Sequence, residues 1–303
     1  MSFSRIASAF LFAVTSAAAL AAGPEPTASA GGTWETADKI FGQPGKDLPG
    51  GVHRFGWPRR DLRVTAGGVA VEPALALGSW AAFVRRGDTD VVAMGDLVLT
   101  ETEVNPVVRA LQDGGLEVLA IHNHLSGETP RVLYVHFHGH GSLDAVARGL
   151  RSALDATSTP LAPAAGSPAA PSPSERAVLD RVQEILDHTG NLAGRVLQVS
   201  VPRAEKIVES GVEIPPAMGL ATALNFQSNG SGVAATGDFV LTAEEVNPVV
   251  RELTTHGIAV TGLHSHLLRE TPRLFFLHFW GVGTADAVAG GLRAALARTS
   301  IRR

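Results

Sequence analysis

Apolar and polar residues recur along the second half of the chain with the periods of strands and helices. Residues 195–201 alternate, and residues 221–226 and 232–241 are further predicted strands. Before them, residues 174–189 predict a helix that Ser174 caps and Gly190 ends. Its apolar face is formed by Val178, Val182, Ile185 and Leu186.

Two starting points compete for the helix that contains Pro248. Thr242 and Glu245 have the spacing of a capping box, whereas Asn247 and Pro248 suit an N-cap and a first turn. Because proline is costly inside a helix, we expect the later start.

The last helix of each half is expected to begin at a capping hydroxyl. Thr284 has this position in the second half and Ser142 in the first. After Ser142, apolar residues recur at helical spacing, as Leu143, Val146, Ala147, Leu150 and Leu154.

The chain contains two copies of one domain. Residues 95–141 align with residues 237–283 without a gap, and more than half of the positions are identical. We predict an α+β (mixed α/β) fold with two tandem homologous domains, each a sheet with flanking helices and a histidine-bearing β-hairpin. The first domain spans residues 31–158, a Pro/Ala/Ser linker spans 159–173, and the second domain spans 174–303.

The N-terminal residues 1–22 have the form of a secretory signal peptide. Arg5 precedes a short apolar run, and small residues at its end suit cleavage after Ala21 or Ala22. We therefore expect a secreted or periplasmic protein with no transmembrane segment in the mature chain. The 303 residues include no cysteine, which excludes disulfides, thiolate metal sites and lipid attachment through cysteine.

Charge argues against a nucleic-acid partner. The formal net charge is −4, and no dense run of Lys and Arg is present. The expected partner is a small-molecule or envelope ligand that the sequence does not name, and the oligomeric state is likewise left open.

Histidines are concentrated in the predicted hairpin of each copy. The first copy contains His122, His124, His136, His138 and His140, and the second contains His264, His266 and His278. In a strand, residues i and i+2 lie on one face about 7 Å apart, so each HxH pair can direct two imidazoles at one ion. The register of the hairpin decides whether both groups share a face, and the sequence leaves it open.

Three of these histidines occur in both copies. His138 and His140 are replaced by Trp280 and Val282, so the first domain is expected to hold the richer site. Alternatively, the shared histidines stabilise the fold as packed, hydrogen-bonded residues, and the additional ones are incidental.

Carboxylates accompany each histidine pair. Glu128 and Glu270 follow the HxH segments, where each is suited to be a general base or to pair with Arg131 or Arg273. Asp96 and Asp238 are candidates for supporting a metal ligand, although a turn is the preferred interpretation.

The duplicated motifs GDxVLTxxEVNPVVR, HxHLxxETPR and HFxGxG resemble those of the LppY/LpqO family of exported bacterial proteins. The resemblance covers essentially the whole mature chain and implies export. It implies membrane attachment through a cysteine in the lipoprotein members, and this chain lacks that cysteine. The family supplies no established activity.

A local similarity connects residues 121–127, IHNHLSG, with the zinc-binding HNHPSG segment of RadC and the JAMM metallopeptidases. Leu125 replaces the proline of that motif, and Val135 stands where its aspartate is expected. The similarity is therefore an analogy for the geometry, in which His136 would substitute as third ligand.

The leading hypothesis is a histidine-ligated metal protein, with zinc first and copper second. His122, His124 and His136 would be the ligands, and His138 or His140 would complete the set or contact a ligand. If the protein is an enzyme, it would be a metal-dependent hydrolase with Glu128 as proton acceptor. Ligation needs neutral imidazoles, so binding should weaken below roughly pH 6.

Two alternatives remain open. The first is a non-enzymatic binding module for metal delivery or for an envelope or small-molecule ligand, with its site between the two domains. The second is a structural duplication whose histidines are satisfied by packing.

Overall fold

Two six-stranded antiparallel sheets make up most of the computed structural model, which describes residues 33–163, 166 and 168–302. All of these residues belong to one unit, Gly32–Arg303. The predicted signal peptide, residues 1–22, lies outside the described residues. No helix among the described residues is long and apolar enough to cross a membrane.

Each repeat supplies one sheet, and the two sheets have the same topology. The first has the order β1 (Lys46–Leu48), β2 (Val52–Pro58), β5 (Gly78–Arg86), β6 (Asp90–Thr100), β8 (Val132–Ser142) and β7 (Glu117–His122). The second has the matching order β9 (Asn191–Ala193), β10 (Val196–Pro202), β13 (Ala221–Asn229), β14 (Gly232–Leu241), β17 (Phe275–Gly283) and β15 (Ala259–His264). The predicted mixed fold with tandem repeats is confirmed.

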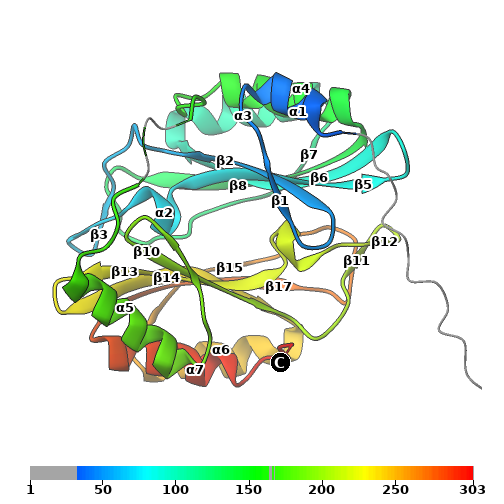
Figure 1. Ribbon diagram of the computed structural model, residues 1–303. Helices are drawn as coiled ribbons and strands as arrows, with labels where there is room; N and C mark the ends of the chain where they lie inside the picture. The colour runs from blue at the N-terminus through cyan, green and yellow to red at the C-terminus, as the bar shows by residue number, and fades with distance from the viewer. Residues whose placement is uncertain (1–32, 164–165, 167, 303) are drawn as a thin grey trace, which may run out of the picture. The chain divides into compact units, whose positions relative to one another are not determined.

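Helices cover the outer face of each sheet (Figure 1). These are α1 (Glu35–Phe41), α3 (Glu101–Asp113) and α4 (Leu143–Asp155) on the first sheet, and α5 (Pro173–Leu186), α6 (Ala243–Thr255) and α7 (Ala285–Leu296) on the second. Their apolar faces pack on outward-facing strand residues in two separate hydrophobic cores, one for each repeat. The apolar stripe predicted after Ser142 is buried in the first of these cores.

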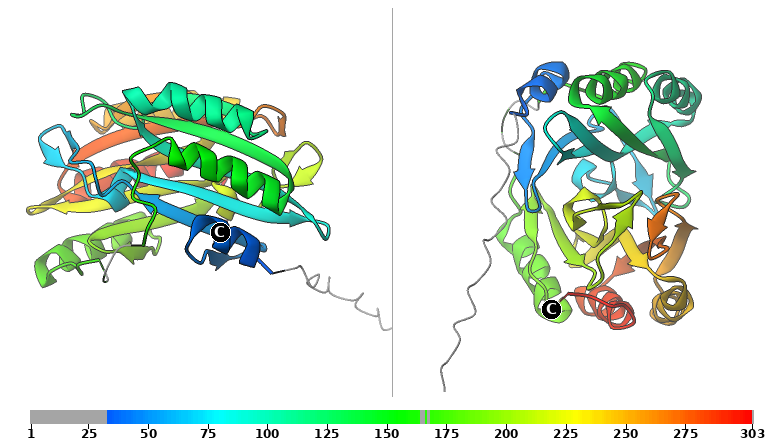
Figure 2. Two further views of the ribbon diagram at one scale, coloured as in Figure 1. Left: turned by 90° about the horizontal axis from the view of Figure 1, so that it is seen from above. Right: turned by 90° about the vertical axis from the view of Figure 1, so that its right-hand side faces the viewer.

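The inner faces of the two sheets pack against each other, which gives four layers (Figure 2). One mixed cluster joins Val92 and Met94 of β6 to Ile207 and Met218 of the second repeat. Because both faces of β6 are covered, all nine residues between its two ends are buried. The strand therefore reads as a nearly continuous apolar run that Asp96 interrupts.

Short elements line the edges of this interface. In the first repeat they are β3 (Thr65–Ala66), β4 (Val69–Ala70) and α2 (Pro73–Ala76). In the second they are β11 (Val208–Glu209), β12 (Val212–Glu213), η1 (Pro216–Met218) and β16 (Glu270–Thr271).

The helix caps correct part of the sequence prediction. Helix α6 begins at Ala243 with a capping box between Thr242 and Glu245, so the expected start at Asn247 is wrong. The proline is tolerated inside the helix because Glu245 fixes the early start, accepting hydrogen bonds from the Thr242 and Ser300 amides.

Other predicted caps agree more closely. Ser142 and Thr284 cap α4 and α7 as expected. Helix α5 is capped by Ser172, two residues before the predicted Ser174, and ends at Leu186. In the predicted linker, the described residues before Pro173 form no helix or strand, and Thr159 is buried.

A buried arginine ties each helix start to its sheet. Arg59 is fully buried, and its Nη1 donates to Glu103 and to the Val98 carbonyl, both at 2.7 Å. Arg203 makes the same contacts with Glu245 and Val240. Each arginine therefore links the N-terminus of a helix to the central strand of its sheet. Breaking such a pair is strongly destabilising, because it leaves a buried charge without its partner.

We predict that Glu103→Ala lowers the free energy of unfolding by about 3–5 kcal/mol. It removes one of the two carboxylates that the buried Arg59 contacts, the other being Asp61, and it leaves the Thr100 and Ser158 amides without their acceptor. Urea denaturation measures the change. The control is Glu101→Ala on the exposed side of the same helix, expected to cost less than about 1 kcal/mol. Equal effects of the two substitutions would contradict this role of the pair.

Candidate metal centre

The strand registers place the histidines of each hairpin on the inner face of the sheet. On β8, His136 is opposite Ala120 of β7 and Asp96 of β6, and His122 is opposite Tyr134. His122 and His136 therefore share a face, which the sequence could not decide. Strand β7 ends at His122, so the expectation that His124 also lies in the strand is wrong; it lies in the following loop.

The second repeat repeats this arrangement. His278 of β17 is opposite Gly262 of β15 and Asp238 of β14, and His264 ends β15. Because the inner faces of the sheets pack together, the two hairpins bring their histidines to one place.

Six imidazoles and two carboxylates meet there in a group that we call the histidine cluster. Its members are Asp96, His122, His124 and His136 of the first repeat and Asp238, His264, His266 and His278 of the second. Contacts cross between repeats: the rings of His122 and His264 are 3.9 Å apart between centroids. His136 Nδ1 lies 2.6 Å from His266 Nε2.

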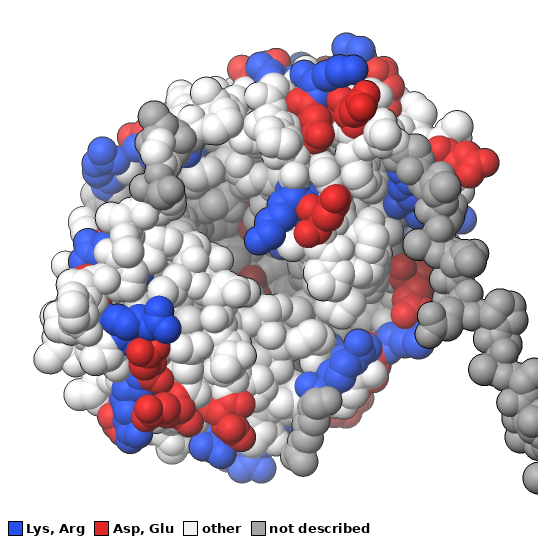
Figure 3. All heavy atoms as spheres, viewed as in Figure 1, with Lys and Arg blue, Asp and Glu red and all other residues white. Residues whose placement is uncertain are grey.

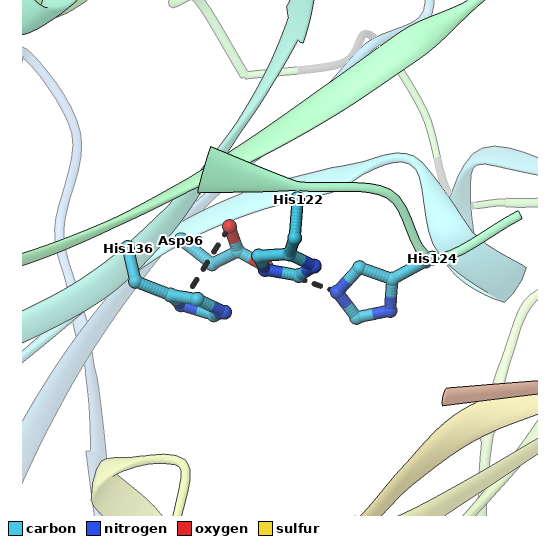
Figure 4. Close-up of side chains that lie close together, drawn as sticks. All are labelled: Asp96, His122, His124 and His136. Carbon is cyan, nitrogen blue, oxygen red and sulfur yellow. Dashed lines mark ion pairs between the residues drawn. The ribbon is translucent and has the colours of Figure 1, made fainter. Parts of the chain in front are cut away.

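Asp96 and Asp238 lie among the imidazoles. Asp96 is 3.4 Å from His124 Nε2 and 3.8 Å from His136 Nδ1. Dashed lines mark these two ion pairs in Figure 4. Asp238 contacts His278 Nδ1 of its own repeat and lies 3.4 Å from His124 Nδ1 of the other. Both are central strand residues, so the preferred turn interpretation is wrong.

The donor atoms of the cluster could hold a metal ion. One nitrogen or oxygen from each of Asp96, His122, His124 and His136 lies within 4.8 Å of the others. Two further sets satisfy the same limit, His122 with His264 and His278, and His124 with Asp238 and His278. The first set lies in one repeat, whereas both of these sets take ligands from both repeats, so the candidate ligands extend across the interface.

Unsatisfied polar atoms support this interpretation. Thirteen buried side-chain nitrogens and oxygens in the described part of the chain have no hydrogen-bond partner, and six of them are in the cluster. They are Asp96 Oδ1, His122 Nε2, His124 Nε2, His136 Nε2, His266 Nδ1 and Asp238 Oδ1, the last of which contacts the His278 ring nitrogen without forming a regular hydrogen bond. Burying such atoms without a partner is costly, and a cation would satisfy them.

Burial favours the neutral form of five of the imidazoles. It lowers the pKa of His264 to about 4 and that of His266 to about 3, and it lowers the pKa values of His122, His124 and His136 well below the ordinary range. Neutral imidazole is the form that ligates metals. Protons should therefore compete with a metal for these imidazoles only at a pH below the value of roughly 6 expected from an unperturbed histidine.

The two aspartates have opposite shifts. Burial, with Asp238 nearby, raises the pKa of Asp96 well above its usual value. Burial also acts to raise the pKa of Asp238, but the adjacent His124 and His278 more than offset it and hold that pKa below the usual range. At neutral pH the negative charge of the pair is therefore expected to reside on Asp238.

Glu128 and Glu270 occupy equivalent positions after the HxH segments, Glu128 in a loop and Glu270 at the start of β16. Glu128 accepts a hydrogen bond from the Val132 amide at 3.4 Å, and Glu270 accepts one from Leu274 at 2.9 Å. Glu270 also pairs with Arg273 at 3.1 Å, which was the alternative considered for it. A catalytic role for Glu128 stays a prediction.

His138 and His140 face another space. They continue along β8 beyond His136 and line a cavity of about 410 Å³ that also contains Glu117, Glu209 and Arg269. Among the described residues, neither belongs to a group of donor atoms close enough to hold a metal. Their assignment as ligands stays a prediction.

Sequence reasoning missed two residues near the cluster. Tyr134 donates to the Ala76 carbonyl, and its ring lies 4.0 Å from that of His124. Arg54 stacks 4.1 Å above the Trp80 ring, and burial lowers its pKa to about 10 despite the opposing effect of Asp96. Neither residue stands out in sequence, because the contacts depend on strand register.

The fold and the site define a tandem-repeat α/β protein with a histidine-rich centre between its halves. The model of a family described as "Domain of Unknown Function (DUF1259)" matches residues 35–156 and 180–298. The chain belongs to this family, in two tandem copies. No curated protein matches the chain.

Two solved structures show distant similarity. The trimeric bacterial microcompartment shell protein PduB has 12% identity and a TM-score of 0.21, covering 84% of this chain and 89% of that chain. EtuB from Clostridium kluyveri has 11% identity and a TM-score of 0.19, with the same coverage of 84% and 89%.

We predict that the metal-free protein loses folding stability as the pH falls from about 6.5 toward 4. Five cluster imidazoles have lowered pKa values, so they bind protons in the unfolded chain at a pH where the folded protein resists them. The raised pKa of Asp96 acts in the opposite direction, but it is one group against five.

Urea unfolding of chelator-treated protein across this pH range measures the effect. His266→Gln should flatten the dependence, whereas His256→Gln, which alters an exposed histidine bonded to its own helix, should leave it unchanged. The same slope in all three proteins would contradict the prediction.

Proposed function

We propose that the protein binds metal at the histidine cluster and that both repeats supply the ligands. The observation that carries the proposal is the convergence of six imidazoles and two carboxylates with unsatisfied donor atoms. Eight donors suffice for up to two four-coordinate ions. Zinc is the first candidate, because imidazole and carboxylate are common zinc ligands, and copper is the second.

The short contacts between nitrogens fit this proposal. His264 Nε2 and His278 Nε2 are 2.7 Å apart, close to the 2.6 Å between His136 and His266. Tetrahedral zinc, with Zn–N near 2.0–2.1 Å, requires ligand nitrogens about 3.3 Å apart. To reach this separation from the observed 2.6 and 2.7 Å, the rings would have to move by less than about 1 Å.

A non-enzymatic binding role is favoured by the number of donors. Catalytic zinc sites keep a position open for water, whereas closed sites fill every position with protein ligands. With two ions bound, eight donors would fill all positions.

Hydrolysis is the second candidate, and the exposure of Asp238 favours it. The Asp238 side chain is 29% exposed and His264 is half-buried, so water reaches one side of the cluster. If an ion is held with fewer ligands, bound water there would be activated as a nucleophile, with Glu128 as the proposed proton acceptor.

We further propose that the chain is exported, with residues 1–22 as signal peptide, as the resemblance to the LppY/LpqO family implies. Cell fractionation with N-terminal sequencing of the recovered protein tests this, and recovery of the uncleaved chain from the cytoplasm would contradict it.

We predict that the purified protein holds zinc or copper in stoichiometric amounts and that His124→Ala and His266→Ala each lower the metal affinity at least about tenfold. One variant lies in each repeat, so losses in both test the shared centre. Elemental mass spectrometry and competition with a chelating dye provide the measurements.

His256→Ala is the matched control, because that imidazole is exposed and bonded to its own helix. Circular dichroism establishes that the variants remain folded. Full metal content in both cluster variants, or no metal in the wild type after reconstitution at neutral pH, would contradict the proposal.

Glu128→Gln separates the two candidate functions. If the centre is hydrolytic, this change should lower turnover by about 10²–10⁴-fold while metal content is retained. Ester and phosphoester substrates screened with the metal-loaded wild type and variant provide the measurement. Equal rates in the two proteins would reject Glu128 as proton acceptor.

A further inference from the structure

One end of the interface between the repeats contains the cavity of about 410 Å³ noted above. Its charged and imidazole residues come from both repeats, and they are Arg86, Glu117, His138 and His140 of the first and Glu209 and Arg269 of the second. His138 lies two residues from His136 on one face of β8, about 7 Å along the strand. The cavity therefore adjoins the histidine cluster.

The opposite end of the interface is related by the duplication but has none of these groups. Strand registers identify the counterparts of the six residues, in the same order, as Asn229, Ala259, Trp280, Val282, Ala66 and Gly127. All six are uncharged. Trp280 packs there against an apolar cluster around Val64 and Ala66.

This difference between the ends is not a requirement of the fold. The same topology closes one end with Trp280 and leaves a polar cavity at the other, where His138 replaces the tryptophan. Arg86, Glu117, Glu209 and Arg269 add two positive and two negative charges to that single cavity. Because the charged residues are present at one end and absent from the other, we take them to be ligand-binding residues.

Two of these charges already satisfy each other. Arg269 donates to both carboxylate oxygens of Glu117 at 2.9 and 3.1 Å, and His138 Nδ1 lies 3.5 Å from the same carboxylate. The Glu117–Arg269 pair therefore joins the repeats across the cavity.

The other two charged residues of the cavity, Arg86 and Glu209, form no ion pair of this kind among the described residues. Arg86 is exposed and forms no ion pair with another residue in the described ranges. Glu209 is only 3% exposed, and its carboxylate accepts a hydrogen bond from the Arg269 backbone amide at 3.2 Å. Burial raises the pKa of Glu209, and the nearby Arg269 guanidinium, which is bonded to Glu117, offsets only part of this effect.

We propose that this cavity binds a free amino acid, whose ammonium group pairs with Glu209 and whose carboxylate pairs with Arg86. A zwitterion matches one anion and one cation that form no ion pair of their own, whereas a simple anion or cation would engage only one of the two. The side chain of His140 adds a donor at the exposed rim. The volume lies in the usual range for small-molecule sites.

The inference goes beyond the proposed metal centre and does not depend on it. Its test uses chelator-treated protein, because amino acids themselves chelate metal ions and would otherwise give a binding signal at the cluster. Failure of metal binding would thus leave the amino-acid site untouched, and the reverse also holds.

The experiment measures thermal shift and then calorimetric binding of the standard amino acids at about 10 mM. Each amino acid that binds is compared with the acid that lacks its amino group and the amine that lacks its carboxylate. We expect at least one amino acid to bind at least about tenfold more tightly than either matched compound.

Three variants then locate the site. Glu209→Gln should abolish the preference for the amino acid over its deaminated acid, and Arg86→Gln should abolish the preference over the matched amine. His138→Trp, which introduces the residue found at the opposite end, should block binding of all three compounds. If that variant fails to fold, the two substitutions by glutamine suffice.

Glu213→Gln is the control for Glu209→Gln, because Glu213 is an exposed glutamate on the same hairpin. Three results would overturn the proposal. They are no binding of any standard amino acid, equal binding of an amino acid and its deaminated acid, and equal behaviour of Glu209→Gln and Glu213→Gln.

Discussion

Packing of the two inner sheet faces around eight polar side chains is the constraint on which the rest of the structure depends. Apolar residues such as Met94 and Met218 drive the sheets together, and the same contact removes the histidine cluster from water. Buried imidazoles and carboxylates need partners, and the repeats supply only part of them to each other. The metal ion that we propose would satisfy several of these donors at once without requiring a proton.

The two repeats are alike at the centre of their interface and differ at its ends. At the centre the copies are alike, since Asp96, His122, His124 and His136 have identical counterparts in Asp238, His264, His266 and His278. At the ends they differ, since Trp280 fills one side and His138 leaves the other open. Residues that are identical in the two repeats therefore form the centre, and residues that differ between them line the adjacent cavity.

Much of the fold was predictable from sequence because its signals are local. The strand at residues 232–241 and the caps at Ser142 and Thr284 lie where the pattern predicts them. The sequence misplaces the start of α6, because the cost of Pro248 inside a helix favours a later start than the capping box does. The glutamate of this capping box is bound by Arg203, and the sequence does not reveal that contact. The pairing of the repeats depends on packing between sheets, so the sequence does not place Asp238 beside His124. The leading sequence hypothesis therefore took its metal ligands from one domain, and only the alternative placed a site between the two.

The most direct test of a centre shared by both repeats is a double-mutant cycle on zinc affinity with His124→Ala and Asp238→Ala, measured by competition with a chelating dye. The two side chains come from different repeats and lie 3.4 Å apart. Our account predicts that the double variant loses clearly less affinity than the sum of the single losses, because both residues serve one ion. Strictly additive losses, or no loss in either single variant, would contradict a shared metal centre.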